Sequence, residues 1–202
     1  MGIIRTHDFT LYGRAGEFRI ALRPLRDAHL PLLYKWNADP EVLYWTCGGE
    51  DDPDPYEPED VETLYRNVSK RAYCFLVEVD GEPVGDCWLL KMELPDVLAM
   101  YPPTSDIRRI DMTIGEKSYW NKGIGTAFVG MLVKFAFYYE RADAIHCLLD
   151  DFNRRSMRVW EKHGFRLVRA DELEQPQKGK KQLHYALTSR EYRDSRAGQT
   201  RF

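Results

Sequence analysis

Paired cysteines and long apolar runs are both scarce in this chain of 202 residues. Its four cysteines, Cys47, Cys74, Cys87 and Cys147, form no Cys-x-x-Cys motif and have no histidine at metal-ligand spacing. The longest uncharged stretches are far shorter than the roughly 18 apolar residues that span a bilayer, and no apolar signal-peptide core follows Met1. We therefore expect a cytoplasmic protein with isolated thiols, no bound metal and no membrane partner.

A strong excess of charge is also missing. The 29 Lys and Arg residues nearly balance the 32 Asp and Glu residues, which gives a net charge of -3. Nucleic-acid binding usually needs a basic surface, so we expect no nucleic-acid partner. Hydrophobic residues make up 44% of the chain, enough for a folded core, which excludes a disordered chain. We expect a single domain over residues 1–202, with its core at 18–192, an N-terminal arm at 1–16 and a frayed tail at 195–202.

Short apolar stretches, alternating with polar residues or lying between turn signals, predict the strands. The segment Asp80-Gly81-Glu82-Pro83 has turn chemistry and joins two of them into an antiparallel hairpin. The predicted strands are 18–23, 73–79, 84–91, 107–114, 144–149, 165–169 and 182–188, with a possible edge strand within 1–16.

Apolar residues at intervals of three and four predict the helices. The first follows Asp27 as its cap and closes before Pro40, and the second carries its apolar positions within 61–68. The longest stripe covers 124–136, and a last helix begins at the cap Asn153. This order predicts an α/β protein of the α+β type, with a mixed, mostly antiparallel sheet of six to seven strands and helices on both faces.

Residues 119–126, Tyr-Trp-Asn-Lys-Gly-Ile-Gly-Thr, lead into the longest predicted helix. Two glycines one residue apart let backbone N–H groups approach a ligand, and the helix N-terminus adds unpaired donors and partial positive charge. This combination is typical of an anion site, although such glycines also occur in loops that bind nothing. The segment is not a Walker A loop and follows no early βαβ unit, which argues against a nucleoside triphosphate or a nicotinamide.

Two motifs together resemble one family. Segment 119–126 is similar to the acetyl-coenzyme A loop of the GNAT N-acetyltransferases, and 153–165 is similar to their Asn-capped helix ending in Glu-Lys-x-Gly-Phe. Trp45 with 48–50, then 81–85 and Ile110-Asp111, is similar to the aminoglycoside 6′-N-acetyltransferases in particular. The resemblance extends over roughly residues 18–192 and implies the GNAT fold, with acetyl-CoA as cosubstrate. Leu148 and Trp160 stand where that group usually has Asp and Tyr.

For the cosubstrate, the resemblance places the pantetheine arm and thioester on the strand that ends at Ile114, where a main-chain N–H meets the oxyanion. Trp160 supplies only an indole N–H, so we expect it to pack in the core or against the pantetheine arm, without acting as an acid. The residues expected to bind the cosubstrate are Met112, Thr113, Ile114, Trp120, Asn121, Lys122, Gly123, Ile124, Gly125, Thr126, Asn153, Ser156 and Trp160.

For the acceptor, the resemblance places Asp111 beside the amine, together with Ile114 as the catalytic pair. Asp111 either accepts a proton or fixes the ammonium, and the alternative is an ion pair with Arg108 or Arg109. Residues 36–65 contain ten acidic side chains and no Lys or Arg, which is typical either of a wall that attracts a polycation or of a solvated loop. The residues expected to bind substrate are Trp45, Glu50, Asp51, Asp111 and Asp150.

These features predict an N-acetyltransferase acting on a small cationic primary amine, with the 6′-amine of an aminoglycoside as the first candidate and antibiotic inactivation as the result. Three alternatives stay open: a siderophore-type hydroxylysine acyltransferase, a ribosomal-protein or peptide N-acetyltransferase, and a non-catalytic module that senses coenzyme A. Either a monomer or a homodimer is compatible with the sequence.

Overall fold

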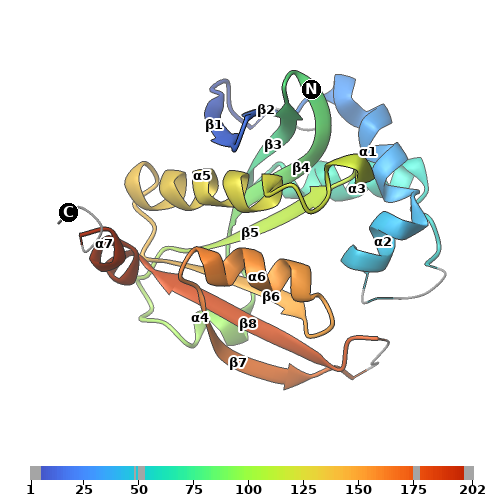
Figure 1. The fold of residues 1–202 in the computed structure, drawn as a ribbon. Coiled ribbons are helices and arrows are strands. Elements are labelled where there is room, and N and C mark those ends of the chain that lie inside the picture. The colour runs from blue at the N-terminus through green and yellow to red at the C-terminus, as the bar shows by residue number, and fades with distance from the viewer. Residues whose placement is uncertain (1–5, 48, 50–52, 175–177, 198–202) are drawn as a thin grey trace.

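One eight-stranded sheet organises the molecule in the computed structural model, which describes residues 6–47, 49, 53–174 and 178–197. The spatial order is β1-β2-β3-β4-β5-β6-β8-β7 (Figure 1), and every neighbouring pair is antiparallel except β5 with β6. The strands are β1 (Leu11–Ala15), β2 (Phe18–Pro24), β3 (Ala72–Val79), β4 (Glu82–Lys91), β5 (Ile107–Ile114), β6 (Ala144–Asp150), β7 (Arg166–Glu172) and β8 (Lys181–Thr188). The predicted sheet class is confirmed, with one strand more because the N-terminal arm forms the edge strand β1.

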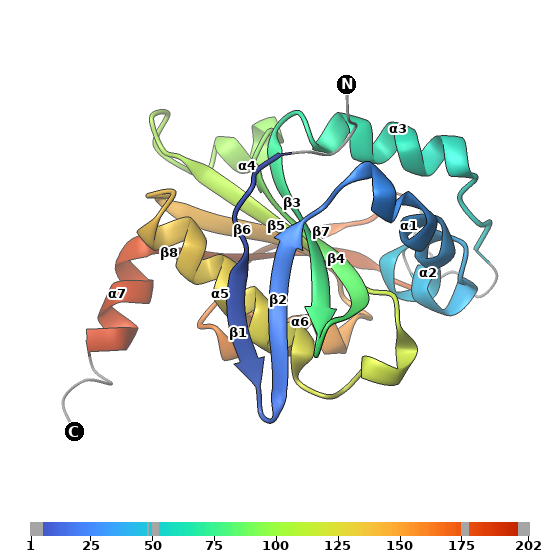
Figure 2. The same cartoon turned by 90° about the horizontal axis from the view of Figure 1, so that it is seen from above.

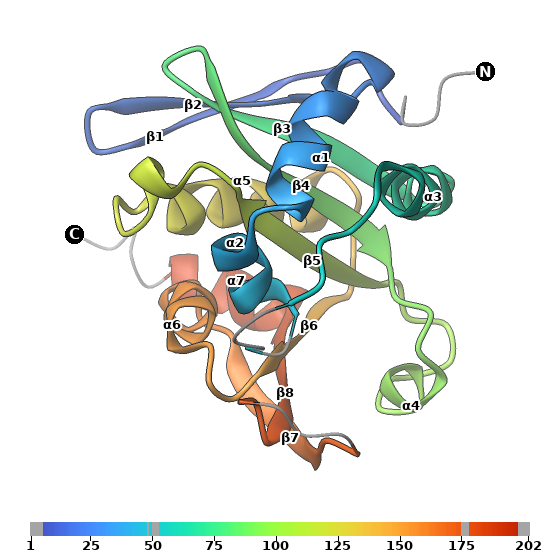
Figure 3. The same cartoon turned by 90° about the vertical axis from the view of Figure 1, so that its right-hand side faces the viewer.

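Helices cover both faces of this sheet. Figure 3 shows α5 and α6 on one face and α3 and α4 on the other, while Figure 2 shows α7 on the opposite side of the molecule from α1 and α2. The helices are α1 (Leu30–Asn37), α2 (Pro40–Thr46), α3 (Pro58–Val68), α4 (Pro95–Leu98), α5 (Ile124–Tyr138), α6 (Arg154–Lys162) and α7 (Ser189–Ala197). Of the described helices, none is both long and apolar enough to cross a bilayer.

Local signals explain most element boundaries, and two expectations are corrected. Asp80 and Gly81 have φ of 52° and 95° in the tight β3–β4 turn, as predicted. Asp27 does not cap α1, because it lies inside the short 3₁₀ helix Asp27–His29 that precedes it. Pro40 begins α2 where a loop was expected: Asp39 caps this helix by accepting the backbone N–H groups of its first turn, and proline suits the first helical position.

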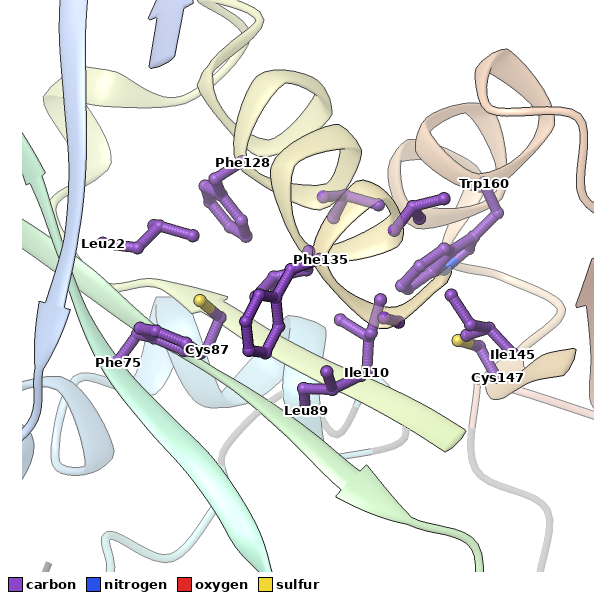
Figure 4. Packing of buried hydrophobic residues seen from close by; sticks show 14 of the residues in the cluster. Leu22, Phe75, Cys87, Leu89, Ile110, Phe128, Phe135, Ile145, Cys147 and Trp160 are labelled. Atoms are coloured by element: carbon purple, nitrogen blue, oxygen red, sulfur yellow. The ribbon is translucent and has the colours of Figure 1, made fainter. Parts of the chain in front are cut away.

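The core lies on both faces of the sheet. Between the sheet and α5 and α6, Phe75 and Ile110 pack with Phe128 and Phe135, and Trp160 of α6 joins the same cluster (Figure 4). A second cluster on the opposite face joins β3 and β4 to α1 and α3. Because both faces are covered, β3 and β4 are almost continuously apolar. Of the two places expected for Trp160, the core and the pantetheine arm, its packing in the core is confirmed.

The strands β5 and β6 separate soon after they meet. They pair only at Ile107 with Ala144 and at Arg108 with Ile145. The β4–β5 ladder, in contrast, continues in constant register to the pair of Gly85 with Ile114. The edge of β5 beyond Arg108 is therefore left without a strand partner, which opens a gap between β5 and β6.

Candidate active site

A cleft of about 910 Å³ lies where β5 leaves β6. It is lined by the second half of β5, the loop and first turn of α5, the end of β6 and the first turns of α6, with α2 at its margin. The residues predicted for the site that line this cleft are Trp45, Asp111, Met112, Thr113, Ile114, Trp120, Asn121, Gly123, Ile124, Gly125, Thr126, Asp150, Asn153, Ser156 and Trp160.

One predicted residue is placed differently, and two lie outside the part of the chain that the structure describes. Lys122 is not among the residues that line the cleft, and its ammonium lies over the rings of Phe18 and Tyr119, 5.8 and 5.5 Å from their centres. Glu50 and Asp51 lie outside the described residues. The Lys122 ammonium therefore contacts aromatic rings outside the lining of the cleft.

The start of α5 presents free backbone donors to the cleft. The first hydrogen bond of the helix runs from the N–H of Ala127 to the carbonyl of Gly123 at 3.0 Å, so the three preceding amides have no acceptor within the helix. Gly123 and Asn121 both have left-handed φ, 78° and 60°, which turns the loop around those amides. Such a concave run of N–H groups at a helix N-terminus binds anions.

Two contacts fix the end of β5 beside this loop. The indole N–H of Trp120 donates to the carbonyl of Ile114 at 2.7 Å. On the other side, a Cβ placed on Gly85 would lie 2.1 Å from the Thr113 carbonyl oxygen, so only glycine allows β4 and β5 to approach this closely. The Trp120 side chain therefore holds the end of β5, the strand that precedes it in the chain.

Asp111 points into the cleft as one half of an ion pair. Its carboxylate accepts from Arg109 Nε at 2.9 Å and lies 2.8 Å from Arg109 Nη2, so the Arg109 alternative is present in the structure. Burial raises the pKa of Asp111, while the Arg109 guanidinium opposes that rise. The arrangement provides a carboxylate whose charge is already partly compensated.

Asp86 also lines the cleft, and sequence reasoning missed it. It lies on β4, is only 3% exposed, and accepts a hydrogen bond from the Tyr65 hydroxyl at 2.9 Å. Burial raises the pKa of Asp86 to about 7, an effect that Asp111 reinforces and that the donors of Tyr65 and Trp88 oppose. A lone carboxylate inside the apolar stretch 84–90 was the available signal, because charged residues are rarely buried without a reason.

The start of α6 ties two walls of the cleft together. Asn153 caps the helix as predicted, accepting from the Ser156 N–H at 3.0 Å, and its amide donates to the Trp45 carbonyl at 3.1 Å. The guanidinium of Arg155 lies over the Trp45 ring at 4.5 Å and over the Trp120 ring at 5.4 Å. Arg155 therefore lies between Trp45, which we predicted to bind the acceptor, and Trp120, which we predicted to bind the cosubstrate.

Trp160 and Asp150 complete the far side of the cleft. The Trp160 indole N–H donates to the Ser156 hydroxyl at 3.0 Å, and its ring packs against Phe165. Burial raises the pKa of Asp150, with a smaller effect from Asp151. Together with Asp86 and Asp111, Asp150 lines the cleft with a third carboxylate.

Of the two alternatives for the acidic stretch at 36–65, a wall of the cleft or a solvated loop, the described part does not form the wall. None of its described acidic side chains lines the cleft. Asp39 and Glu41 pair instead with Lys117 at 3.0 and 3.1 Å. Among the described residues, the acidic groups that line the cleft are Asp86, Asp111 and Asp150.

Comparison with known proteins gives one family and a set of similar folds. The family model described as "Acetyltransferase (GNAT) domain" matches residues 19–166. An aminoglycoside N(6′)-acetyltransferase type 1 of Klebsiella pneumoniae is 24% identical over 157 residues, which are 72% of this chain and 73% of that protein.

The solved structures with a similar fold include enzymes bound to coenzyme A. An aminoglycoside acetyltransferase in complex with coenzyme A and kanamycin has a TM-score of 0.68 at 20% identity, over 88% of this chain and 99% of that one. A spermidine N-acetyltransferase from Vibrio cholerae with coenzyme A and spermine has a TM-score of 0.69 at 15% identity, over 86% and 97%. An uncharacterized protein from Bacillus halodurans has a TM-score of 0.75 at 16% identity, over 98% and 100%.

Proposed function

The chain belongs to the GNAT acetyltransferase family, and from this premise we propose that its acceptor is a cationic primary amine, first of all the 6′-amine of an aminoglycoside. It is an acetyl-CoA-dependent N-acetyltransferase, and acetyl-CoA supplies the acetyl group as a thioester. One observation carries the proposal: the free amides of α5 and the carboxylates of Asp86, Asp111 and Asp150 line the same cleft. This pairing suits a reaction between an anionic cosubstrate and a cationic acceptor.

On the cosubstrate side, the main chain of residues 121–126 is assigned to the pyrophosphate, because it offers the free amides of the α5 N-terminus. The peptide groups of Met112, Thr113 and Ile114 lie on the part of β5 that has left β6, and they are assigned to the pantetheine arm. A backbone N–H near Ile114 is assigned to the developing oxyanion.

The departing thiolate needs no protein acid in this site. The Trp160 indole N–H is not acidic near neutrality and already donates to Ser156. A thiol with a pKa near 8.5 leaves as a thiolate at little cost around neutral pH. The residues of the site are therefore assigned to binding, to orientation and to the proton of the amine.

A polyamine is the second candidate acceptor. It is supported by the fold shared with the spermidine N-acetyltransferase from Vibrio cholerae, and polyamines carry the same kind of cationic amine. Both candidates would be drawn to the three carboxylates that line the cleft.

A thiol-release assay with dithionitrobenzoate tests the acceptor class. The purified chain is supplied with acetyl-CoA and, separately, with kanamycin, spermine, hydroxylysine and a short peptide with a free amino terminus. We expect the highest kcat/KM with kanamycin, at least tenfold above that with hydroxylysine or the peptide. Turnover confined to hydroxylysine or the peptide would overturn the proposal, and coenzyme A binding without turnover of any amine would indicate a sensor.

A further inference from the structure

Two carboxylates of the cleft lie on one face of neighbouring strands. In the β4–β5 ladder, Asp86 is opposite Thr113 and Trp88 is opposite Asp111. Residues opposite each other share a face, as do residues two apart, so Asp86 and Asp111 are diagonal neighbours on the same side of the sheet. That side is the one covered by α3, whose Tyr65 reaches Asp86. Thr113, which we assign to the pantetheine arm, is opposite Asp86 and two residues from Asp111 on the same face.

The surroundings of the two carboxylates differ in one respect. Asp111 has the Arg109 guanidinium at 2.8 to 2.9 Å, whereas the groups that act on Asp86 bring no positive charge. The titratable groups that interact electrostatically with Asp86 are Tyr65 from α3, Cys74 from β3, Asp111 from β5 and the adjacent Cys87, whose side chain points to the other face of β4. Burial raises the pKa of Tyr65 and of both thiols, which keeps these three groups neutral.

We propose that Asp86 is a catalytic residue that takes the proton of the acceptor ammonium, while Asp111 holds that ammonium in place. This inference rests on the proposed function, because it requires an amine that arrives protonated. A pair of carboxylates with different surroundings divides such roles well: a neighbouring cation favours the ionised form of one, and burial without a compensating cation favours proton uptake by the other.

The step balances as follows. One N–H proton moves from the ammonium to the Asp86 carboxylate, directly or through one water, and leaves a neutral amine. The amine nitrogen attacks the thioester carbonyl carbon, the C–N bond forms, and the C–S bond then breaks. The second N–H proton goes to the departing thiolate, and Asp86 returns its proton to solvent before the next turnover. No oxidant or reductant is needed.

Asp86→Asn, with Asp111→Asn as its matched partner, tests this division of roles. We use whichever of kanamycin and spermine the enzyme turns over faster, and record kcat and kcat/KM from pH 5.5 to 9. For Asp86→Asn we expect kcat at pH 7.5 to fall at least tenfold and the ionisation near pH 7 to disappear. For Asp111→Asn we expect kcat/KM to fall at least tenfold through a higher KM for the amine, with that ionisation retained.

A second variant keeps the test decisive if Asp86→Asn does not fold. Tyr65→Phe removes a hydrogen bond that favours ionised Asp86, so it should move the ionisation to higher pH. Carbon-13 NMR of selectively labelled aspartate provides a readout besides activity. One carboxyl resonance should titrate near neutral pH and shift its midpoint upward in Tyr65→Phe.

The outcomes separate the two proposals. Coenzyme A affinity within twofold of the wild type, by calorimetry, shows that a variant is folded. If a folded Asp86→Asn variant keeps kcat and the ionisation, or if no carboxyl midpoint moves in Tyr65→Phe, Asp86 is not the proton acceptor. If the wild type acetylates neither kanamycin nor spermine, the proposed acceptor class is what fails.

Discussion

Gly123 is the single residue on which the assignment of the anion site depends most. Its φ of 78° is unfavourable for any side chain, above all a β-branched one, while a Cβ there would meet nothing within 4 Å. Gly123→Val therefore alters the backbone of the loop without a packing clash. We expect coenzyme A to bind at least tenfold more weakly, measured by calorimetry.

Gly16 provides a matched control for this substitution. It also has positive φ, 59°, and open space around a Cβ, but it lies in the β1–β2 turn rather than among the residues of the cleft. Gly16→Val should cost similar backbone strain and leave coenzyme A affinity unchanged. Equal affinity in both variants and the wild type would contradict the assignment of the pyrophosphate to this loop.

Among the elements, β5 depends on a glycine of its neighbour. Because a Cβ at Gly85 would lie 2.1 Å from the Thr113 oxygen, Gly85→Ala must push β4 away from Thr113 and Ile114, which line the cleft. We expect a loss of about 1 to 3 kcal/mol in the free energy of unfolding, the usual cost of overpacking, measured by denaturant titration. Acetyl transfer should fall further than stability alone explains, because the assigned oxyanion donor moves. If Gly85→Ala had wild-type stability and activity, the close approach of β4 to β5 would not be needed.

Elements with strong local signals could be predicted from the sequence, and those set by distant contacts could not. β5 has the predicted bounds, and the β3–β4 turn lies at Asp80-Gly81, two residue types that accept positive φ. Pro40 is locally ambiguous, since proline both follows the end of one helix and begins another. The diagonal neighbours Asp86 and Asp111 meet only through strand register, which local sequence does not specify.

For the whole molecule, a buried histidine chain makes stability depend on pH. His146 Nδ1 lies 2.8 Å from the Tyr101 hydroxyl, its Nε2 lies 2.9 Å from His184 Nδ1, and His184 Nε2 lies 3.1 Å from Asp171. Burial, with smaller effects from His184 and Arg169, lowers the pKa of His146 to about 4. The unfolded chain binds a proton here near its ordinary pKa of about 6.5, so acid favours unfolding. Between pH 7 and pH 5 this group removes about 2 kcal/mol of stability.

Asp86 acts in the opposite direction over the same range. Its pKa of about 7 in the folded state lies above the ordinary value of about 3.9, so the folded state binds the proton first and gains stability as pH falls. From pH 7 to pH 5 this gain is about 2 kcal/mol, which offsets the loss at His146.

Because the two effects offset each other, removing either group should change how the free energy of unfolding varies with pH, measured by denaturant titration at pH 5, 6 and 7. In the Asp86→Asn variant the histidine is no longer offset, so stability at pH 5 should fall by about 2 kcal/mol relative to pH 7, beyond any wild-type change. His146→Gln should have lower stability at pH 7, because a buried hydrogen bond is lost. Its stability should nevertheless rise from pH 7 to pH 5, whereas that of Asp86→Asn falls. The double variant should show the wild-type dependence of stability on pH, because no described contact links the two side chains and their effects should add. Parallel curves for the wild type and Asp86→Asn would mean that Asp86 titrates alike in the folded and unfolded states, and would leave it without the proton affinity that its role in acetyl transfer requires.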